Sequence, residues 1–171
     1  MTRTILALDF GGTKLSAALF GAGTARKERQ GRSERQEKTQ RASSLREALP
    51  TYNLLDLRRI VTPADADAAY ELAAMVALAR ELLDGHAPAV VGVSFGGPVD
   101  YATGVVRLSH HVRGWERVPL RDRLAVEFGC PVAVDNDANV AALGEHRFGA
   151  GRGMADMMYV TVSTGVGGGW I

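Results

Sequence analysis

The stretch that decides the fold is Leu6-Ala7-Leu8-Asp9-Phe10-Gly11-Gly12-Thr13-Lys14-Leu15-Ser16-Ala17-Ala18-Leu19. An apolar run enters a turn of two glycines and a threonine, and a second apolar run leaves it. This pattern predicts a β-hairpin formed by Ile5–Asp9 and Leu15–Phe20. Glycine lets the backbone turn with positive φ and approach a ligand closely. Successive N–H groups in such a turn can form an anion-binding nest, so the hairpin is a candidate phosphate site.

A second glycine-rich stretch repeats the pattern near the other end of the chain. It reads Tyr159-Val160-Thr161-Val162-Ser163-Thr164-Gly165-Val166-Gly167-Gly168-Gly169-Trp170-Ile171. Two phosphate-sized turns so far apart in sequence predict a nucleotide that is held from two sides.

The composition is that of a globular protein. The 171 residues are 46% hydrophobic and 23% charged, with a net charge of +1 that gives no general attraction to nucleic acid or membranes. No apolar run approaches the roughly 20 residues that span a bilayer. Cys130 is the single cysteine, so no internal disulfide can form, and we expect a cytoplasmic protein.

The segments between the glycine motifs predict an α/β fold. After the hairpin we expect a strand at Leu54–Val61 and a helix that begins at Thr62–Asp65 and ends at Gly85. Further strands and helices alternate, as follows: strand Val90–Phe95, helix Leu120–Phe128, strand Val132–Val134, helix Asp137–Phe148 and strand Met157–Val162. A nucleotide hairpin followed by crossover helices predicts an actin-like (ribonuclease-H-like) ATPase domain, with a mixed sheet that starts with a β-hairpin and is flanked by helices.

Residues 26–49 break this pattern. Arg26 to Glu47 contains eight basic and four acidic residues and almost nothing apolar, which predicts a solvated insertion. The alternative is an arm that binds phosphate groups or nucleic acid. We expect residues 1–150 to form one domain that carries this insertion, and residues 151–171 to begin a second, truncated domain.

Polar residues at the first turn suit nucleotide chemistry. Asp9 can hold Mg²⁺, directly or through water, or it can simply initiate the turn through its own backbone. Thr13 and Lys14 supply a hydroxyl and a cation where phosphates need them, although Lys14 can equally be a solvent-facing strand residue. No Gly-Lys-Ser/Thr leads into a helix, so the motif is not a P-loop.

The cluster Asp135-Asn136-Asp137-Ala138-Asn139 lies between a predicted strand and a predicted helix. One interpretation is that Asp137 is simply the N-cap of that helix. However, one cap needs one such residue, whereas four of these five are Asp or Asn. Amides and carboxylates together recognise adjacent sugar hydroxyls, and a carboxylate can take the proton of an attacking hydroxyl.

Other polar segments are less specific. Glycines in Ser94-Phe95-Gly96-Gly97-Pro98-Val99-Asp100 can admit a sugar ring close to the backbone or can form a simple turn. His110-His111, close to Trp115, can line a sugar site, but the histidines lack metal-ligand spacing. Cys130 fits a small core residue better than a nucleophile.

Together these motifs resemble the ROK family of bacterial sugar kinases and related repressors. The resemblance runs through residues 6–20, 90–100, 114–148 and 159–171, and more loosely through 54–83. It implies ATP-dependent phosphorylation of a hexose, with glucose the leading candidate, at its 6-hydroxyl, with ATP and Mg²⁺ as cofactors. Asp137 would be the catalytic base, and Asn136, Gly97 and His111 would bind the sugar. The phosphate-binding residues would be Asp9, Gly11, Gly12, Thr13, Lys14, Thr164, Gly165 and Gly167, with Asp9 also the Mg²⁺ ligand, directly or through water.

The chain departs from the family pattern in several places. Family members usually have Gly and Pro where Ser94 and Gly96 stand, and Asn where His111 stands. The family also continues well beyond the second phosphate motif, with a zinc loop, further sugar ligands and an adenosine pocket. The resemblance therefore implies that these 171 residues alone are nearly inactive, and that the complete protein is a homodimer.

Two other functions stay open. A ROK-type repressor would need a helix-turn-helix domain before the first motif, where only eight residues precede Asp9. A non-catalytic fragment that binds sugar weakly is the second alternative.

The insertion generates a first prediction. Deleting Arg26 to Glu47 and joining the ends with a short turn should change the free energy of unfolding by less than about 1 kcal/mol, because loop-closure entropy varies slowly with length. Trypsin should cut rapidly inside the segment while the rest of the chain survives. Protection of the segment, together with a large loss of stability on deletion, would contradict the solvated-loop interpretation.

Overall fold

The central element is a mixed, five-stranded β-sheet. The structure is a computed structural model that describes residues 4–23, 52–162 and 166–171. Within these residues the strand order is β3-β2-β1-β4-β7. The five strands are β1 (Thr4–Phe10), β2 (Lys14–Ala22), β3 (Tyr52–Val61), β4 (Val90–Phe95) and β7 (Val132–Asn136).

The direction of the strands divides this sheet into two halves. β1, β2 and β3 are antiparallel neighbours, as the glycine hairpin requires. β4 pairs with β1 in parallel, and β7 pairs with β4 in parallel. Each parallel step needs a crossover connection, which α1 (Ala68–Leu83) and α2 (Leu120–Phe128) supply.

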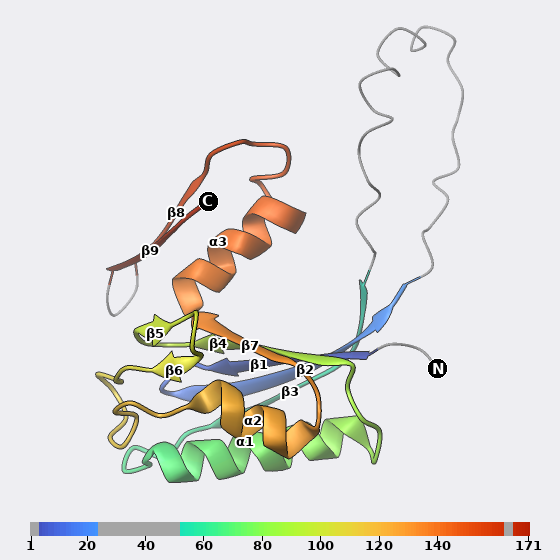
Figure 1. The fold of residues 1–171 in the computed structure, drawn as a ribbon, viewed down its shortest axis with the longest axis vertical. Coiled ribbons are helices and arrows are strands. Elements are labelled where there is room, and N and C mark those ends of the chain that lie inside the picture. Colours follow the sequence, from blue (N-terminus) through green and yellow to red (C-terminus); the bar gives the residue numbers. More distant parts are fainter. Residues whose placement is uncertain (1–3, 24–51, 163–165) are drawn as a thin grey trace, which may run out of the picture.

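The core lies between these two helices and one face of the sheet. Figure 1 shows α1 and α2 side by side beneath the strands. Alternate residues of β1 point into this layer, and Leu6, Leu8 and Phe10 are at most 2% exposed. The helices contribute an apolar stripe to the same layer, made up of Met75, Leu78, Ala79, Leu82, Leu120, Leu124 and Phe128.

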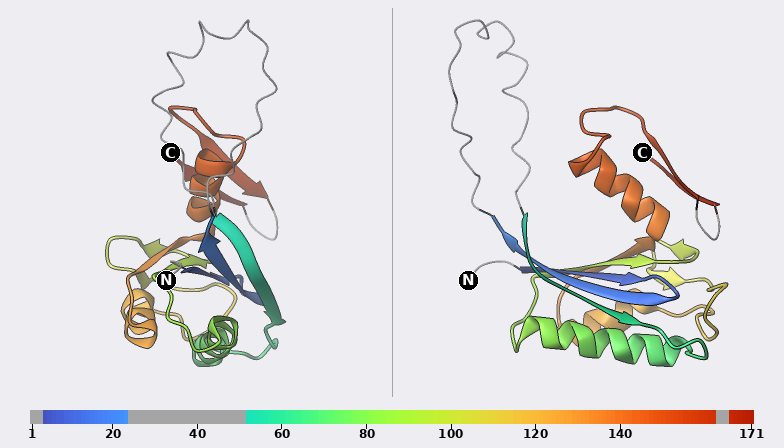
Figure 2. Two further views of the ribbon diagram at one scale, coloured as in Figure 1. Left: turned by 90° about the vertical axis from the view of Figure 1, so that its right-hand side faces the viewer. Right: turned by 180° about the vertical axis from the view of Figure 1, so that it is seen from behind.

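The last helix lies apart from this layer. α3 (Asp137–Phe148) begins where β7 ends and rises from the opposite side of the sheet (Figures 1 and 2). β8 (Met158–Val162) and β9 (Val166–Trp170) form a separate antiparallel pair that packs beside α3. Two short strands, β5 (Val99–Asp100) and β6 (Val105–Val106), form a small hairpin after β4.

The predicted elements form in the predicted order, the structure adds the β5–β6 hairpin between them, and the start of the first helix is displaced. Residues 62–65 do not begin the first helix. α1 begins at Ala68, and Asp67 is its N-cap, whose side chain accepts a hydrogen bond from the Tyr70 N–H at 2.9 Å. The N–H of Thr62 instead donates to the carbonyl of Thr13 at 3.0 Å, so this segment extends the hairpin. The predicted insertion at 26–49 lies outside the described residues.

One charged side chain is buried in the core. Glu71 of α1 is 1% exposed, and its Oε2 accepts a 2.7 Å hydrogen bond from the Trp115 indole Nε1–H. Burial raises the pKa of Glu71 above its ordinary value of 4.5, whereas the neighbouring groups of Trp115 and Thr62 lower it. The net shift is upward, so the fold favours the protonated carboxyl.

This shift predicts a pH dependence of stability. Between pH 4.5 and the higher folded-state pKa, the folded protein holds a proton that the unfolded chain releases. The Glu71 contribution to the free energy of unfolding is therefore fully present below pH 4.5 and falls as the pH rises through this window. Glu71→Gln should remove this component, measured by urea denaturation at several pH values. Glu81→Gln, an exposed control on the same helix, should not change the slope, and equal slopes for all three proteins would contradict the assignment.

Candidate functional site

The carboxyl ends of three parallel strands meet at one edge of the sheet. Phe10 pairs with Phe95, and Phe95 pairs with Asn136, so β1, β4 and β7 end at the same level. The predicted motifs that follow these strands therefore lie beside one another, although they are far apart in sequence. In open α/β sheets this edge is the usual place for ligands.

The first glycine turn has the sharp geometry that its sequence predicts. Gly12 adopts φ of 71°, in the left-handed region that favours glycine. The N–H groups of Gly11 and Thr13 donate within the turn, to Lys14 and Gly11 respectively. Of the N–H groups of Gly11, Gly12 and Thr13, only that of Gly12 has no acceptor among the described residues. Thr13 is exposed.

Asp9 is the partly buried carboxyl of this site. Burial is the largest cause of its raised pKa, and the hydrogen-bonding Ser94 side chain opposes that effect. The negative charge of Asp137 raises the pKa further, and the positive charge of Arg59 lowers it. Burial and the Asp137 charge both disfavour the charged form of Asp9, and a bound cation would offset them.

Asn136, and not Asp137, is the N-cap of α3. The Asn136 backbone is extended, and its Oδ1 accepts a 3.0 Å hydrogen bond from the Ala138 N–H. Asp137 is the first residue of the helix and also accepts from Ala138 at 2.8 Å. The prediction that Asp137 occupies the N-cap position is therefore wrong, because Asn136 fills it, although the Asp137 side chain also accepts a hydrogen bond in the first turn.

The Asn136 side chain also links two strand ends. Its Nδ2 donates a 3.0 Å hydrogen bond to the Gly97 carbonyl, which brings two predicted sugar-binding residues together. The third, His111, lies against the glycine turn, since a Cβ built on Gly12 would be 3.4 Å from the His111 Cβ. The structure thus gathers the predicted residues of the first turn, the Gly97 loop and the Asn136 cluster at one place.

A cavity of about 730 Å³ adjoins this edge, on the face of the sheet opposite α1 and α2. Asp9, Ser94 and Asp135 stand in one row across β1, β4 and β7, and Ser16 and Arg59 extend the row onto β2 and β3. All five line the cavity. Sequence reasoning missed Arg59, because an exposed strand without alternation does not reveal which side chains share a face with Asp9.

The glycines of the second motif have a packing role. A Cβ on Gly169 would lie 2.7 Å from the Ala142 Cβ, and one on Gly167 would lie 3.4 Å from the Ala138 Cβ. β9 therefore approaches α3 closely, next to Asp137. Thr164 and Gly165 lie outside the described residues.

Two candidates remain, Lys14 and Cys130. Lys14 is exposed at the start of β2, on the same face as Ser16. Burial raises the pKa of the Cys130 thiol, and Cys130 packs against the core, as expected for a structural residue. Among the described residues, no group of three or more His, Cys, Asp or Glu side chains could hold a metal ion. No helix of the described ranges has the length and apolar character needed to cross a membrane.

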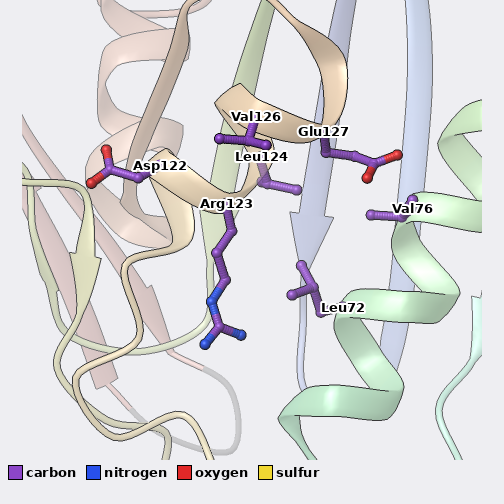
Figure 3. Close-up of a pocket in the computed structure, with 7 residues that line it drawn as sticks. All are labelled: Leu72, Val76, Asp122, Arg123, Leu124, Val126 and Glu127. Atoms are coloured by element: carbon purple, nitrogen blue, oxygen red, sulfur yellow. The ribbon is translucent and has the colours of Figure 1, made fainter.

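A second hollow lies on the other side of the molecule. Figure 3 shows it between α1 and α2, where Leu72 and Val76 face residues of α2 such as Leu124. It holds about 510 Å³ and contains none of the predicted site residues.

The mixed sheet, its crossover helices and the motifs at its strand ends define an α/β domain of the actin-like type. A family model described as "ROK family" matches residues 51–171, so the chain belongs to the ROK family. It is 44% identical over 89 residues to a glucokinase of Thermotoga maritima, which is 52% of this chain and 28% of that protein. It is 35% identical over 120 residues to a glucokinase of Streptomyces coelicolor, which is 70% of this chain and 37% of that protein.

Solved structures of ROK family proteins share this fold. A ROK family glucokinase from Streptomyces griseus, in complex with glucose and AMPPNP, superposes with a TM-score of 0.66 at 31% identity, covering 100% of this chain and 44% of that one. A ROK family transcriptional regulator superposes with a TM-score of 0.71 at 18% identity, covering 99% of this chain and 36% of that one, which shows the shared fold. These neighbours confirm the predicted actin-like ATPase fold. The chain spans less than half the length of each of these relatives.

Gly97 offers a direct test of the close approach at this edge. A Cβ at this position would lie 2.8 Å from the Leu108 carbonyl oxygen and 3.0 Å from the Phe95 ring. Gly97→Ala should therefore lower the free energy of unfolding by about 1–3 kcal/mol, measured by urea denaturation. Gly92→Ala is the control, since a Cβ there meets nothing within 4 Å. Equal free energies of unfolding for the two variants would show that the Gly97 loop accommodates a Cβ without strain, which would contradict the close approach.

Proposed function

We propose that the protein phosphorylates a hexose at its 6-hydroxyl with ATP, and that glucose is the leading substrate. One observation carries this proposal: Asp137 directly follows Asn136 at the carboxyl edge of the sheet, where β1, β4 and β7 end in register and Asn136 bonds to Gly97. A carboxylate in that position can serve as a general base between a sugar hydroxyl and a terminal phosphate. The glucokinases among the relatives support the same reaction.

The phosphate side would be formed by the two glycine motifs. The N–H of Gly12, the Thr13 hydroxyl and the Lys14 ammonium would contact phosphate oxygens, and Gly11 shapes the turn. Thr164, Gly165 and Gly167 would contribute from the second motif. Asp9 would hold Mg²⁺, directly or through water, since a divalent cation would offset the effects that disfavour its charged form.

The sugar side would be formed by Asn136, the Gly97 backbone and His111. Asn136 already uses one N–H toward Gly97 and one lone pair toward Ala138. It therefore keeps one N–H and one lone pair for sugar hydroxyls, held in a fixed direction. Its two protein contacts preorganise the ligand side of the amide before substrate arrives.

In the proposed step Asp137 accepts the proton of the 6-hydroxyl while the oxygen attacks the γ-phosphorus. The new O–P bond forms as the bond between the γ-phosphorus and the bridging oxygen breaks, which releases ADP. The magnesium ion and the turn would stabilise the charge that develops on the phosphate oxygens. Positioning and electrostatics account for most of the rate in such transfers.

Further parts of this proposal concern the whole protein. β8 and β9 would begin a second domain after residue 150, and closure of the two domains would exclude water from the cleft. Use of ATP fits a cytoplasmic protein, and we propose a homodimer as the functional assembly.

A sugar-responsive transcriptional regulator is the alternative. The regulator among the structural neighbours has the same fold, and the xylose repressor of Caldicellulosiruptor bescii is 37% identical over 81 residues. The two proposals differ in a measurable way, because a kinase turns over ATP only when the hexose is present. A repressor would bind the sugar without ADP release.

Asp137→Asn tests the catalytic assignment in the full-length protein. Turnover in a coupled ADP-release assay should fall about 10²–10⁴-fold, because the amide cannot accept the proton. The melting temperature should hardly change, since Asn136 remains the cap of α3.

Asp122→Asn is the matched control, because Asp122 is the acidic residue in the first turn of α2. It should retain wild-type turnover. Near-full turnover by Asp137→Asn would rule out its role as the base.

A further inference from the structure

Glu71 stands where packing alone would favour an apolar residue. It shares a buried helix face with Ala68, Met75 and Leu78, and it is 1% exposed. A buried carboxyl is unfavourable unless it is hydrogen-bonded, and a partnered one fixes a unique arrangement of its neighbours more than it adds stability. The 2.7 Å hydrogen bond from Trp115 therefore calls for a reason other than packing.

Trp115 lies directly behind both strand ends of the site. Its ring meets Phe10 edge-on at a centroid distance of 5.5 Å and Phe95 at 4.9 Å. Phe10 precedes the Gly11–Lys14 turn, and Phe95 precedes the Gly96–Gly97 pair. One indole thus packs against the two residues from which both loops start.

The start of α1 and the segment before it also hold the backbone near Trp115 and the backbone of the first glycine turn. The Ala68 N–H donates to the Arg113 carbonyl at 2.9 Å, two residues before Trp115. The Thr62 N–H donates to the Thr13 carbonyl at 3.0 Å. The Thr62 hydroxyl is buried near the Glu71 carboxyl, and neither this hydroxyl nor Oε1 of Glu71 has a hydrogen bond of standard geometry.

The two segments held in this way meet at the site itself. A Cβ on Gly12 would be 3.4 Å from the His111 Cβ, so the phosphate turn and the His111 segment lie close together, with little room for a side chain between them. We propose that Glu71 is a positioning residue: its hydrogen bond to Trp115 fixes residues 107–118 against the Gly11–Lys14 turn. The distance between the proposed sugar and phosphate sites depends on it. The activity part of this inference rests on the proposed function.

Amide hydrogen exchange of the ligand-free, full-length protein tests the inference without reference to activity. Glu71→Met keeps an apolar side chain of similar size and removes the acceptor, and Trp115→Phe removes the donor. Both should raise exchange rates by at least about tenfold across residues 11–14 and 108–115, consistent with local opening. Glu71→Gln, which still accepts from the indole, should stay within about threefold of wild type.

Leu82→Val is the control for general destabilisation, since Leu82 is buried at the far end of the same helix. It should leave exchange in both segments close to wild type. If folded Glu71→Met and Trp115→Phe exchange no faster than Leu82→Val in these segments, the positioning role is overturned. If Glu71→Met does not fold, the exchange rates of Trp115→Phe relative to Leu82→Val decide the question.

Kinetics provide the second readout. Glu71→Met should lower kcat/KM for the hexose about 10–100-fold, because a misplacement of about 1 Å has effects of that size. Glu71→Gln should rescue it to within about threefold. Absence of hexose phosphorylation in the wild type would contradict the proposed function, whereas the exchange measurements would still decide the role of Glu71.

Discussion

The parallel pairing of β1, β4 and β7 is the constraint on which the site depends. Because Phe10, Phe95 and Asn136 stand in register, three loops from distant parts of the sequence start at one level. A slip of one residue in either pair would turn every side chain of a strand to the other face. Asp9 would then point into the core, and Phe10 would point toward the cavity.

Close packing at that edge explains several of the small residues. A Cβ on Gly96 would be 3.1 Å from the Phe10 carbonyl oxygen, and one on Gly97 would be 2.8 Å from the Leu108 carbonyl oxygen. The glycines therefore bring neighbouring backbones into contact, and the aromatic cluster of Phe10, Phe95 and Trp115 supports them from the core side. The hydrogen bond from Trp115 to the buried Glu71 fixes the orientation of the indole, which apolar contacts alone would leave freer to rotate.

The acidic and amide cluster after β7 divides its tasks among neighbours. Asn136 caps the helix and holds the Gly97 carbonyl, whereas Asp135 accepts from the Asn139 side chain at 3.0 Å. The side chains of Asn136, Asp135 and Asn139 are therefore used in hydrogen bonds that hold the structure. Asp137 is the first residue of α3, and the helix dipole favours a negative charge at this N-terminus.

The sequence by itself determined the hairpin, the order of the elements and the family, because glycine turns and apolar periodicity are local signals. It also identified Asp9, Asn136 and Asp137 as polar residues at strand ends. It misplaced the start of α1 by several residues, because a Thr-Pro pair with acidic neighbours imitates a cap that tertiary pairing with Thr13 overrides. Only the tertiary structure decided that Asn136 is the cap, that Arg59 faces Asp9, and that Glu71 holds Trp115. Those relations depend on which strands pair and which faces they present, and no local pattern specifies a contact between residues as distant as 71 and 115.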